Sequence, residues 1–198
     1  MNPRGMVLTR DGKTLMVANN ADRSLSFVEV ESFRERKRIP VGVAPRHLVL
    51  SPDGATAYLA ETGYGIAFID VQKERIFKRV RVGQSPKSIV LSKDGRFLYS
   101  SDYRGHSLSI VDTQTFETVR MKLNILRSSG IDVHPNDGFI YISGWCTNDV
   151  WAIQRVNPGE AATLPLGKYR HNRPCYACEM PSTGCPSLAQ IEKWMGPR

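Results

Sequence analysis

The feature of this sequence that most constrains its fold is an internal repeat of about 42 residues. Four Asp-Gly pairs mark the copies, and their glycines are 42, 41 and 43 residues apart. The pairs are Asp11-Gly12, Asp53-Gly54, Asp94-Gly95 and Asp137-Gly138. A unit this short cannot bury its own apolar face, so successive copies must stack on one another. The repeat therefore predicts a stacked array of similar units.

The second copy shows most clearly what one unit contains. Residues 48–50 and 57–60 are apolar runs on either side of a Ser-Pro-Asp-Gly turn, which is the pattern of a β-hairpin. Residues 66–70 form a third apolar run, and residues 75–82 form a fourth, more charged one. Four short strands per repeat are typical of one blade of a β-propeller. The sequence thus predicts an all-β fold with blades near 3–44, 45–85, 86–127 and 128–167.

The copies share further positions. Each has a tyrosine in its second strand (Tyr58, Tyr99, Tyr141), and two third strands end in an aspartate (Asp70, Asp112). The units close with Val41-Gly42, Val82-Gly83 and Leu166-Gly167. Over residues 3–167 this pattern resembles the YVTN-type β-propeller repeat.

The resemblance has implications for the size of the ring and for function. Similar propellers usually close a ring of about seven blades, so four copies indicate a fragment, an uncommon four-bladed ring, or a partial ring completed by another copy or another chain. A partial ring leaves an unpaired strand edge at each end, which favours association. Relatives of this type are surface-layer modules, binding platforms, lactonases and cofactor-bearing dehydrogenase subunits, so the fold alone does not define the function.

The charge balance indicates the kind of partner. The net charge of +8 favours anionic partners, although the same charge is also typical of solvated outer strands. Nucleic acid is disfavoured, because the sequence has no recognisable reading motif. We expect no membrane span and no signal peptide, since no apolar run approaches 18 residues and Met1 leads directly into the first strand. The family resemblance leans towards a periplasmic or extracellular location.

One repeat column collects cations at the start of the inner strands. Arg4, Arg46 and Lys87 each follow the proline that opens a copy, and His47 occupies the next column. In a propeller these strand starts surround the mouth of the central channel. We therefore predict an anion-binding site from Arg4, Arg46, His47 and Lys87; the alternative is that each is an independent surface charge.

Acidic residues at different positions of the repeat lead to different predictions. Asp132 replaces the valine of the other copies on an inner strand, and His134 lies two residues on, which places both side chains on one face. With His47 they are the candidate catalytic residues. Asp70 and Asp112 are predicted to form turns, and Asp102 to cap one.

The segment after the repeats is of another kind. Residues 168–198 form a predicted Pro/Gly/Cys-rich extension, with a short amphipathic helix near 187–195 that would cap blade four. His171, Cys175, Cys178 and Cys185 have a spacing that fits a zinc site. Alternatively, Cys146 and the three tail cysteines would form two disulfides, or they would be free or partly paired thiols. A Cys-x2-Cys-His sequence, which attaches c-type heme, does not occur. Apart from zinc, we expect no cofactor.

Together these features favour a noncatalytic binding or assembly module. Residues 1–156 would contact protein or an anionic ligand through the blade rims and open edges. One alternative is a lactonase-like hydrolase that uses Arg46, His47 and Asp132 in the central channel. A second alternative is a propeller subunit of a redox complex whose cofactor belongs to another subunit.

Overall fold

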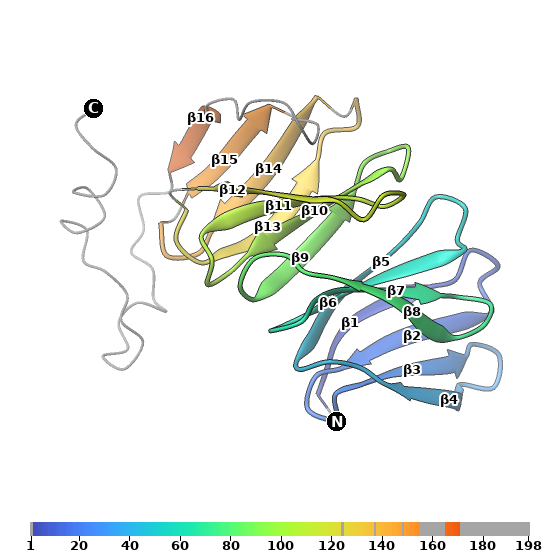
Figure 1. The fold of residues 1–198 in the computed structure, drawn as a ribbon. Coiled ribbons are helices and arrows are strands. Elements are labelled where there is room, and N and C mark those ends of the chain that lie inside the picture. The colour runs from blue at the N-terminus through green and yellow to red at the C-terminus, as the bar shows by residue number, and fades with distance from the viewer. Residues whose placement is uncertain (1, 124, 137, 148, 155–164, 171–198) are drawn as a thin grey trace.

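The computed structural model describes residues 2–123, 125–136, 138–147, 149–154 and 165–170. These residues form strands and turns with no helix among them, and therefore include no helix long and apolar enough to cross a membrane. The all-β prediction is confirmed. The strands group into four antiparallel sheets of four, each in sequence order (Figure 1).

Each sheet is one blade, built from a continuous stretch of chain. Blade 1 consists of β1 (Pro3–Leu8), β2 (Thr14–Asn19), β3 (Ser24–Glu29) and β4 (Arg34–Pro40). Blade 2 consists of β5 (Pro45–Leu50), β6 (Thr56–Glu61), β7 (Gly65–Asp70) and β8 (Arg75–Val80). Blade 3 consists of β9 (Pro86–Leu91), β10 (Phe97–Asp102), β11 (Ser107–Asp112) and β12 (Thr118–Lys122). Blade 4 consists of β13 (Ser128–Val133), β14 (Phe139–Gly144), β15 (Asp149–Gln154) and β16 (Pro165–Arg170).

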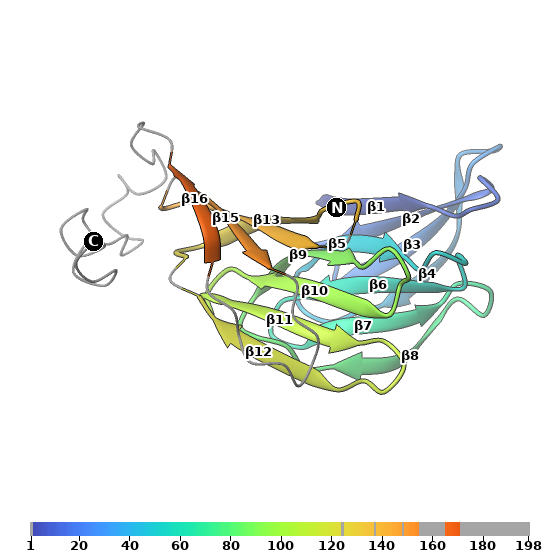
Figure 2. The same ribbon diagram turned by 90° about the horizontal axis from the view of Figure 1, so that it is seen from above.

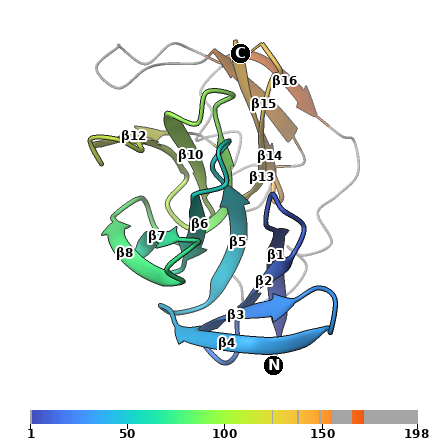
Figure 3. The ribbon, with the colours of Figure 1, turned by 90° about the vertical axis from the view of Figure 1, so that its right-hand side faces the viewer.

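The blades fan out as an arc. The first strands β1, β5, β9 and β13 pack side by side on its inner side. In Figure 2 the sheets sweep from β1–β4 on the right to β13–β16 on the left, and the top of the view stays open. Figure 3 shows β4, β8 and β12 at the periphery, with β5 towards the middle. The described residues thus form part of a propeller ring.

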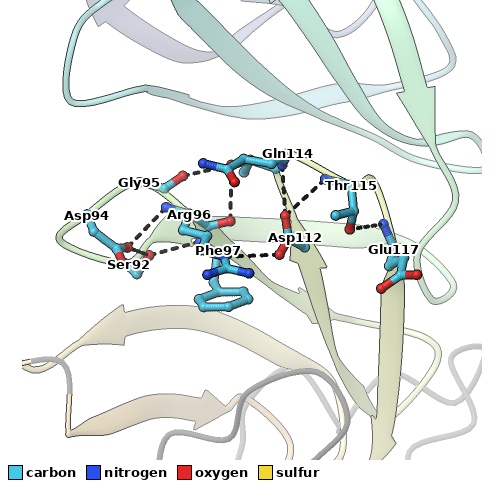
Figure 4. A network of polar contacts seen from close by, with 10 residues as sticks. Ser92, Asp94, Gly95, Arg96, Phe97, Asp112, Gln114, Thr115 and Glu117 are labelled. Carbon is cyan, nitrogen blue, oxygen red and sulfur yellow. Dashed lines mark hydrogen bonds and ion pairs between the residues drawn. The ribbon is translucent and has the colours of Figure 1, made fainter.

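The turns explain why the repeat has its acidic residues. In blade 3, the Asp94 carboxylate accepts the N–H of Arg96 at 3.0 Å and the Ser92 hydroxyl, which fixes the β9–β10 hairpin (Figure 4). Asp112 accepts the N–H groups of Gln114 and Thr115 at 2.8 and 3.0 Å (Figure 4). Asp70 does the same for Lys73 at 2.8 Å. The predicted turn-forming role of Asp70 and Asp112 is confirmed.

The hydrophobic core lies between the blades. Leu48 of blade 2 packs with Met16 and Phe27 of blade 1, and Ile89 of blade 3 packs with Tyr58 and Phe68 of blade 2. A third cluster joins blades 3 and 4. Blades 2 and 3 therefore bury one face against the preceding blade and the other against the following blade, as the repeat requires.

Both ends of the arc leave a face uncovered by the described residues. On blade 1, Met6 is 63% exposed and Leu8 is 49% exposed, whereas Leu48, at the position of Met6 in the repeat, is 3% exposed. On blade 4, Asp132 and Val150 are exposed on the face opposite the core cluster. The uncovered face of blade 1 is apolar, and the uncovered face of blade 4 is mixed.

Candidate functional site

The first strands of the blades begin with a β-bulge that singles out the predicted cations. The pairing of β1 with β2 shifts between Pro3 and Gly5, and the pairing of β9 with β10 shifts between Pro86 and Ser88. Arg4 and Lys87 are thereby left out of the ladder, and a shift between Pro45 and Leu48 does the same for Arg46 and His47. A bulge redirects a side chain away from its sheet. The local fold thus presents these residues at the starts of the inner strands, along one side of the arc, which we call the rim.

Lys87 is the centre of the rim. Its ammonium lies 4.5 Å from the ring centroid of Tyr103 and 4.3 Å from that of Trp145. The two rings, 6.3 Å apart, come from the β10–β11 and β14–β15 loops. The Arg127 guanidinium lies 5.7 Å from the Tyr103 ring and donates to its hydroxyl at 3.3 Å. Cation–π contacts thus hold both Lys87, at the start of β9, and Arg127, in the loop before β13, against the ring of Tyr103.

The rim is strongly positive. Burial lowers the pKa of Lys87, and the Arg46 and Arg4 guanidiniums lower it further. Burial also lowers the pKa of Arg46, to which Arg4 and Arg104 contribute. Among the described residues no carboxylate forms an ion pair with Arg4, Arg46 or Lys87. The structure therefore brings the three predicted cations near one another, without acidic partners. We call Arg4, Arg46, Lys87, Tyr103, Arg127 and Trp145 the rim cluster.

His47 has a different environment from the cations beside it. Its Nδ1 accepts the backbone N–H of Ile89 at 3.2 Å, which joins blade 2 to blade 3. Burial lowers its pKa, so the ring is neutral near pH 7. An Nδ1 that accepts a hydrogen bond leaves the proton of the neutral ring on Nε2. In this arrangement His47 connects two blades and does not offer a free lone pair to a ligand.

His106 is a histidine that the sequence interpretation did not single out. It ends the β10–β11 loop with a left-handed φ of 49°. Its Nδ1 lies 3.1 Å from the carbonyl oxygen of Ile125, which can only accept, so Nδ1 carries the proton. In the neutral ring this tautomer leaves the lone pair on Nε2, and the carbonyl fixes the ring as backbone carbonyls do for metal-binding histidines.

The predicted acid–base residues do not form one group. The Asp132 carboxylate is exposed on the open face of blade 4 and accepts the N–H of Val133 at 2.9 Å. His134 contacts Asn136 Oδ1 at 2.6 Å in the β13–β14 turn and packs near Tyr141. None of the hydrogen bonds or ion pairs of the described residues joins His47, Asp132 and His134. Their catalytic role stays a prediction.

Asp102 does not cap a turn in the expected manner. It is fully buried, and its Oδ2 accepts the hydroxyls of Ser107 and Ser109, each at 2.8 Å. Gly83 lies against it, where a Cβ atom would approach Asp102 Oδ2 to 2.0 Å. The closing Val-Gly of the second repeat thus has a steric reason, because only glycine fits in the β8–β9 connection beside the buried carboxylate of blade 3.

The tail predictions fall outside the described residues. This applies to the helix near 187–195, to the zinc candidates His171, Cys175, Cys178 and Cys185, and to three of the four disulfide candidates. Cys146 is buried in the β14–β15 loop, next to Trp145. No group of three metal-ligating side chains occurs in the part of the chain that the structure describes. The zinc and disulfide alternatives stay predictions.

Fold and rim together define a class: a segment of a β-propeller with a cationic and aromatic site at the rim. A sequence profile of the cytochrome D1 heme domain matches residues 10–138, which is more than half of the chain. The chain belongs to this family. No curated protein sequence is similar enough to count as a match. The comparison confirms a β-propeller family, and the YVTN-type assignment stays a prediction.

Solved structures share the fold. Hydrazine synthase of Kuenenia stuttgartiensis has a TM-score of 0.71 at 22% identity, over 77% of this chain and 46% of that chain. The periplasmic gluconolactonase of Pseudomonas aeruginosa has a TM-score of 0.71 at 19% identity, over 87% and 55%. The dihydro-heme d1 dehydrogenase NirN, solved with the ligand DHE, has a TM-score of 0.65 at 17% identity, over 86% and 38%. The chain thus spans about half the length of these proteins or less, and the likeness concerns the fold.

Family membership corrects one expectation. The sequence interpretation expected no cofactor other than zinc, and the match to a heme domain contradicts it. The described residues include groups that suit a heme: a histidine, His106, whose Nδ1 faces a backbone carbonyl, aromatic faces at the rim, and cations that suit carboxylates. The error arose because the repeat encodes the blade scaffold, whereas these groups lie in bulges and loops that differ from copy to copy.

Proposed function

We propose that the protein is a ligand-binding propeller module whose rim cluster takes a flat, conjugated, carboxylate-bearing molecule of the tetrapyrrole class. The observation that carries this proposal is the position of Lys87 between Tyr103 and Trp145, beside Arg46 and Arg4 and without an acidic partner. Clustered cations repel one another unless an anion joins them. The arrangement therefore favours a bound anion.

The aromatic residues indicate the shape of that anion. Trp145 is 46% exposed although it contacts the Lys87 ammonium, so a large π-surface at the rim remains open. Aromatic faces stack on flat conjugated systems, whereas a small inorganic ion gains nothing from them. Arg4 and Arg46 would bind the carboxylates of such a ligand. The heme-domain family supports the same ligand class.

His106 is the residue that we assign to the metal of a bound heme. The Ile125 carbonyl keeps its Nδ1 protonated, which leaves Nε2 as the coordinating atom. A heme bound here would supply an iron that accepts and donates single electrons, the chemistry of the redox-complex alternative. The other blades of a complete ring would contribute the rest of the site.

Binding of protoporphyrin IX tests the proposal. We expect Lys87→Gln and Trp145→Ala each to weaken binding of protoporphyrin IX about tenfold, because each removes a charged or stacking contact of about 1–2 kcal/mol. Lys78→Gln is the matched control, since Lys78 also lies over a ring, that of Phe116 at 5.0 Å, but on the outer strand β8. Fluorescence quenching measures the affinity. Equal affinity of all three variants and the wild type would contradict the proposal.

A second candidate function is assembly through the uncovered blade faces, and the exposure of Met6 and Leu8 favours it. A blade of a second chain would cover this apolar face of blade 1, as blade 1 covers the equivalent Leu48 face of blade 2. For the lactonase-like alternative, the described contacts provide less support. His47 is engaged with the Ile89 N–H, and it contacts neither Asp132 nor His134.

A further inference from the structure

A hollow of about 430 Å³ lies on the rim side of the arc, between blades 2 and 3. Its walls are the β6–β7 loop (residues 62–65), the connection from β8 to β9 (residues 81–85) and Arg104 of the β10–β11 loop. We call it the side hollow. Gly63 leaves room in it, because a Cβ atom at this position would have no neighbour within 4 Å.

The charged side chains that line the side hollow are all basic. Arg81 and Arg104 are both exposed, and none of its lining residues is acidic. The nearby carboxylates are already engaged: Glu61 binds the Gly42 N–H and Arg79, and Asp102 binds serine hydroxyls. Neither is a partner for the two arginines. The side hollow therefore has two guanidiniums and no anion.

A second hollow, of about 920 Å³, shows the contrast. It lies at the Asp-Gly turns of blades 1 and 2 and includes four acidic and four basic side chains. Its carboxylates bind turn N–H groups or, for Glu74, the Arg36 guanidinium. The acidic and basic side chains of this second hollow balance one another, so its charge does not favour a bound ion.

Arg104 connects the side hollow with the rim. It lowers the pKa of Arg46 and directly follows Tyr103, whose ring faces Lys87. Hydrogen bonds hold this loop against the β8–β9 connection, from Tyr103 N to Ser85 O at 3.0 Å and from Arg104 N to Gln84 O at 3.3 Å. One positive surface thus continues from the aromatic rings into the hollow.

From this geometry we infer that the side hollow is an anion subsite, in which Arg81 and Arg104 bind a carboxylate arm of the ligand whose flat body lies on the rim. The inference rests on the proposed function and adds to it the requirement that the ligand carries a flexible arm ending in a carboxylate. A flat molecule without such an arm would occupy the rim alone.

A pair of probes isolates the arm from the flat body. Pyrene-1-butanoate has a flat ring system and one carboxylate arm, and pyrene-1-butanamide has the same shape without the charge. At constant ionic strength, we expect the wild type to bind the butanoate about tenfold more tightly, as for a charge-assisted hydrogen bond. Arg81→Gln and Arg104→Gln should each reduce this difference to about twofold and leave amide binding unchanged.

Two further variants control the result. Arg34→Gln removes the same charge from the exposed start of β4, away from the hollow, and should preserve the tenfold difference. Gln84→Trp would fill the hollow without changing its charge and should abolish the difference. The inference is overturned if the wild type binds both probes equally, or if the arginine variants weaken both probes by one common factor.

Failure of the proposed function gives another pattern. In that case neither pyrene probe binds the wild type, or Trp145→Ala leaves the affinity for both unchanged. An acetate titration followed at the amide signals of Gly63 and Gly65 then tests the hollow by itself. Shifts that disappear in Arg81→Gln support an anion site, and the absence of shifts in the wild type rejects it.

Discussion

Asp102 is a fully buried carboxylate that three serine hydroxyls surround, with no ion pair among the described residues. Burial raises its pKa above the ordinary value of 3.8, although the serine hydroxyls act in the opposite direction. The folded state therefore binds the proton more tightly than the unfolded state. The free energy of unfolding should fall as the pH rises from 3.8 through the raised pKa, and the loss is complete above it.

Asp102→Asn should remove this loss. Blade 1 already has the amide version, since Asn19 Nδ2 donates to Ser24 and Ser26 at 3.3 and 2.7 Å. At pH 7 we expect the free energy of unfolding of the variant to equal or exceed that of the wild type. Any excess over the wild type should decrease as the pH falls towards 4, because Asp102 of the wild type then becomes protonated. Urea unfolding between these pH values measures it. As a control, Asp102→Ala should cost about 1–3 kcal/mol, because it leaves serine hydroxyls without an acceptor. A pH-independent loss in Asp102→Asn would contradict the expectation.

The sequence predicted the position of part of the candidate site, at the scale of residues, and anion binding there stays a prediction. The column of Arg4, Arg46 and Lys87 was visible because the repeat aligns them, and their proximity follows from the propeller geometry. Tyr103 and Trp145 also share a column, directly after the second strand, where the earlier copies have Asn20 and Thr62. That change from polar to aromatic residues was the signal for the rim, and it was masked by the turn-like composition of these loops.

At the scale of elements, equivalent positions of the first strands β1 and β5 differ in whether another blade covers them. Leu48→Ala in β5 should destabilise the protein by roughly 2–5 kcal/mol, because this side chain is 3% exposed within the core between blades 1 and 2. Met6→Ala, at the equivalent place in β1, should change the stability by less than about 0.5 kcal/mol in dilute solution. Chemical unfolding of the two variants compares them directly. Equal losses would mean that the β1 face is covered.

The elements themselves were the most predictable part of the molecule. Asp-Gly turns, short apolar runs and charged outer strands specify local hairpins, so the four-stranded blades follow from the sequence. The shifts in register at the strand starts were not predictable, because a bulge depends on how the chain enters from the neighbouring blade. These bulges are nevertheless what presents the cations at the rim.

At the scale of the whole molecule, a repeat specifies how a blade contacts its neighbour and leaves the number of blades open. We expect the purified chain to associate in a concentration-dependent way, because Met6 and Leu8 expose an apolar face that a further blade would bury. Met6→Lys and Leu8→Lys should prevent this association, since a charge there cannot be buried unpaired. Val119→Lys, on the outer strand β12, is the control, as Val119 is also partly exposed, at 39%. Sedimentation velocity gives the mass of each variant. A wild type that is monomeric at all concentrations would show that this face is not used for assembly. Association of the Met6 and Leu8 variants to the same extent as the wild type would show the same. The ligand site of the rim would then have to function on an open arc.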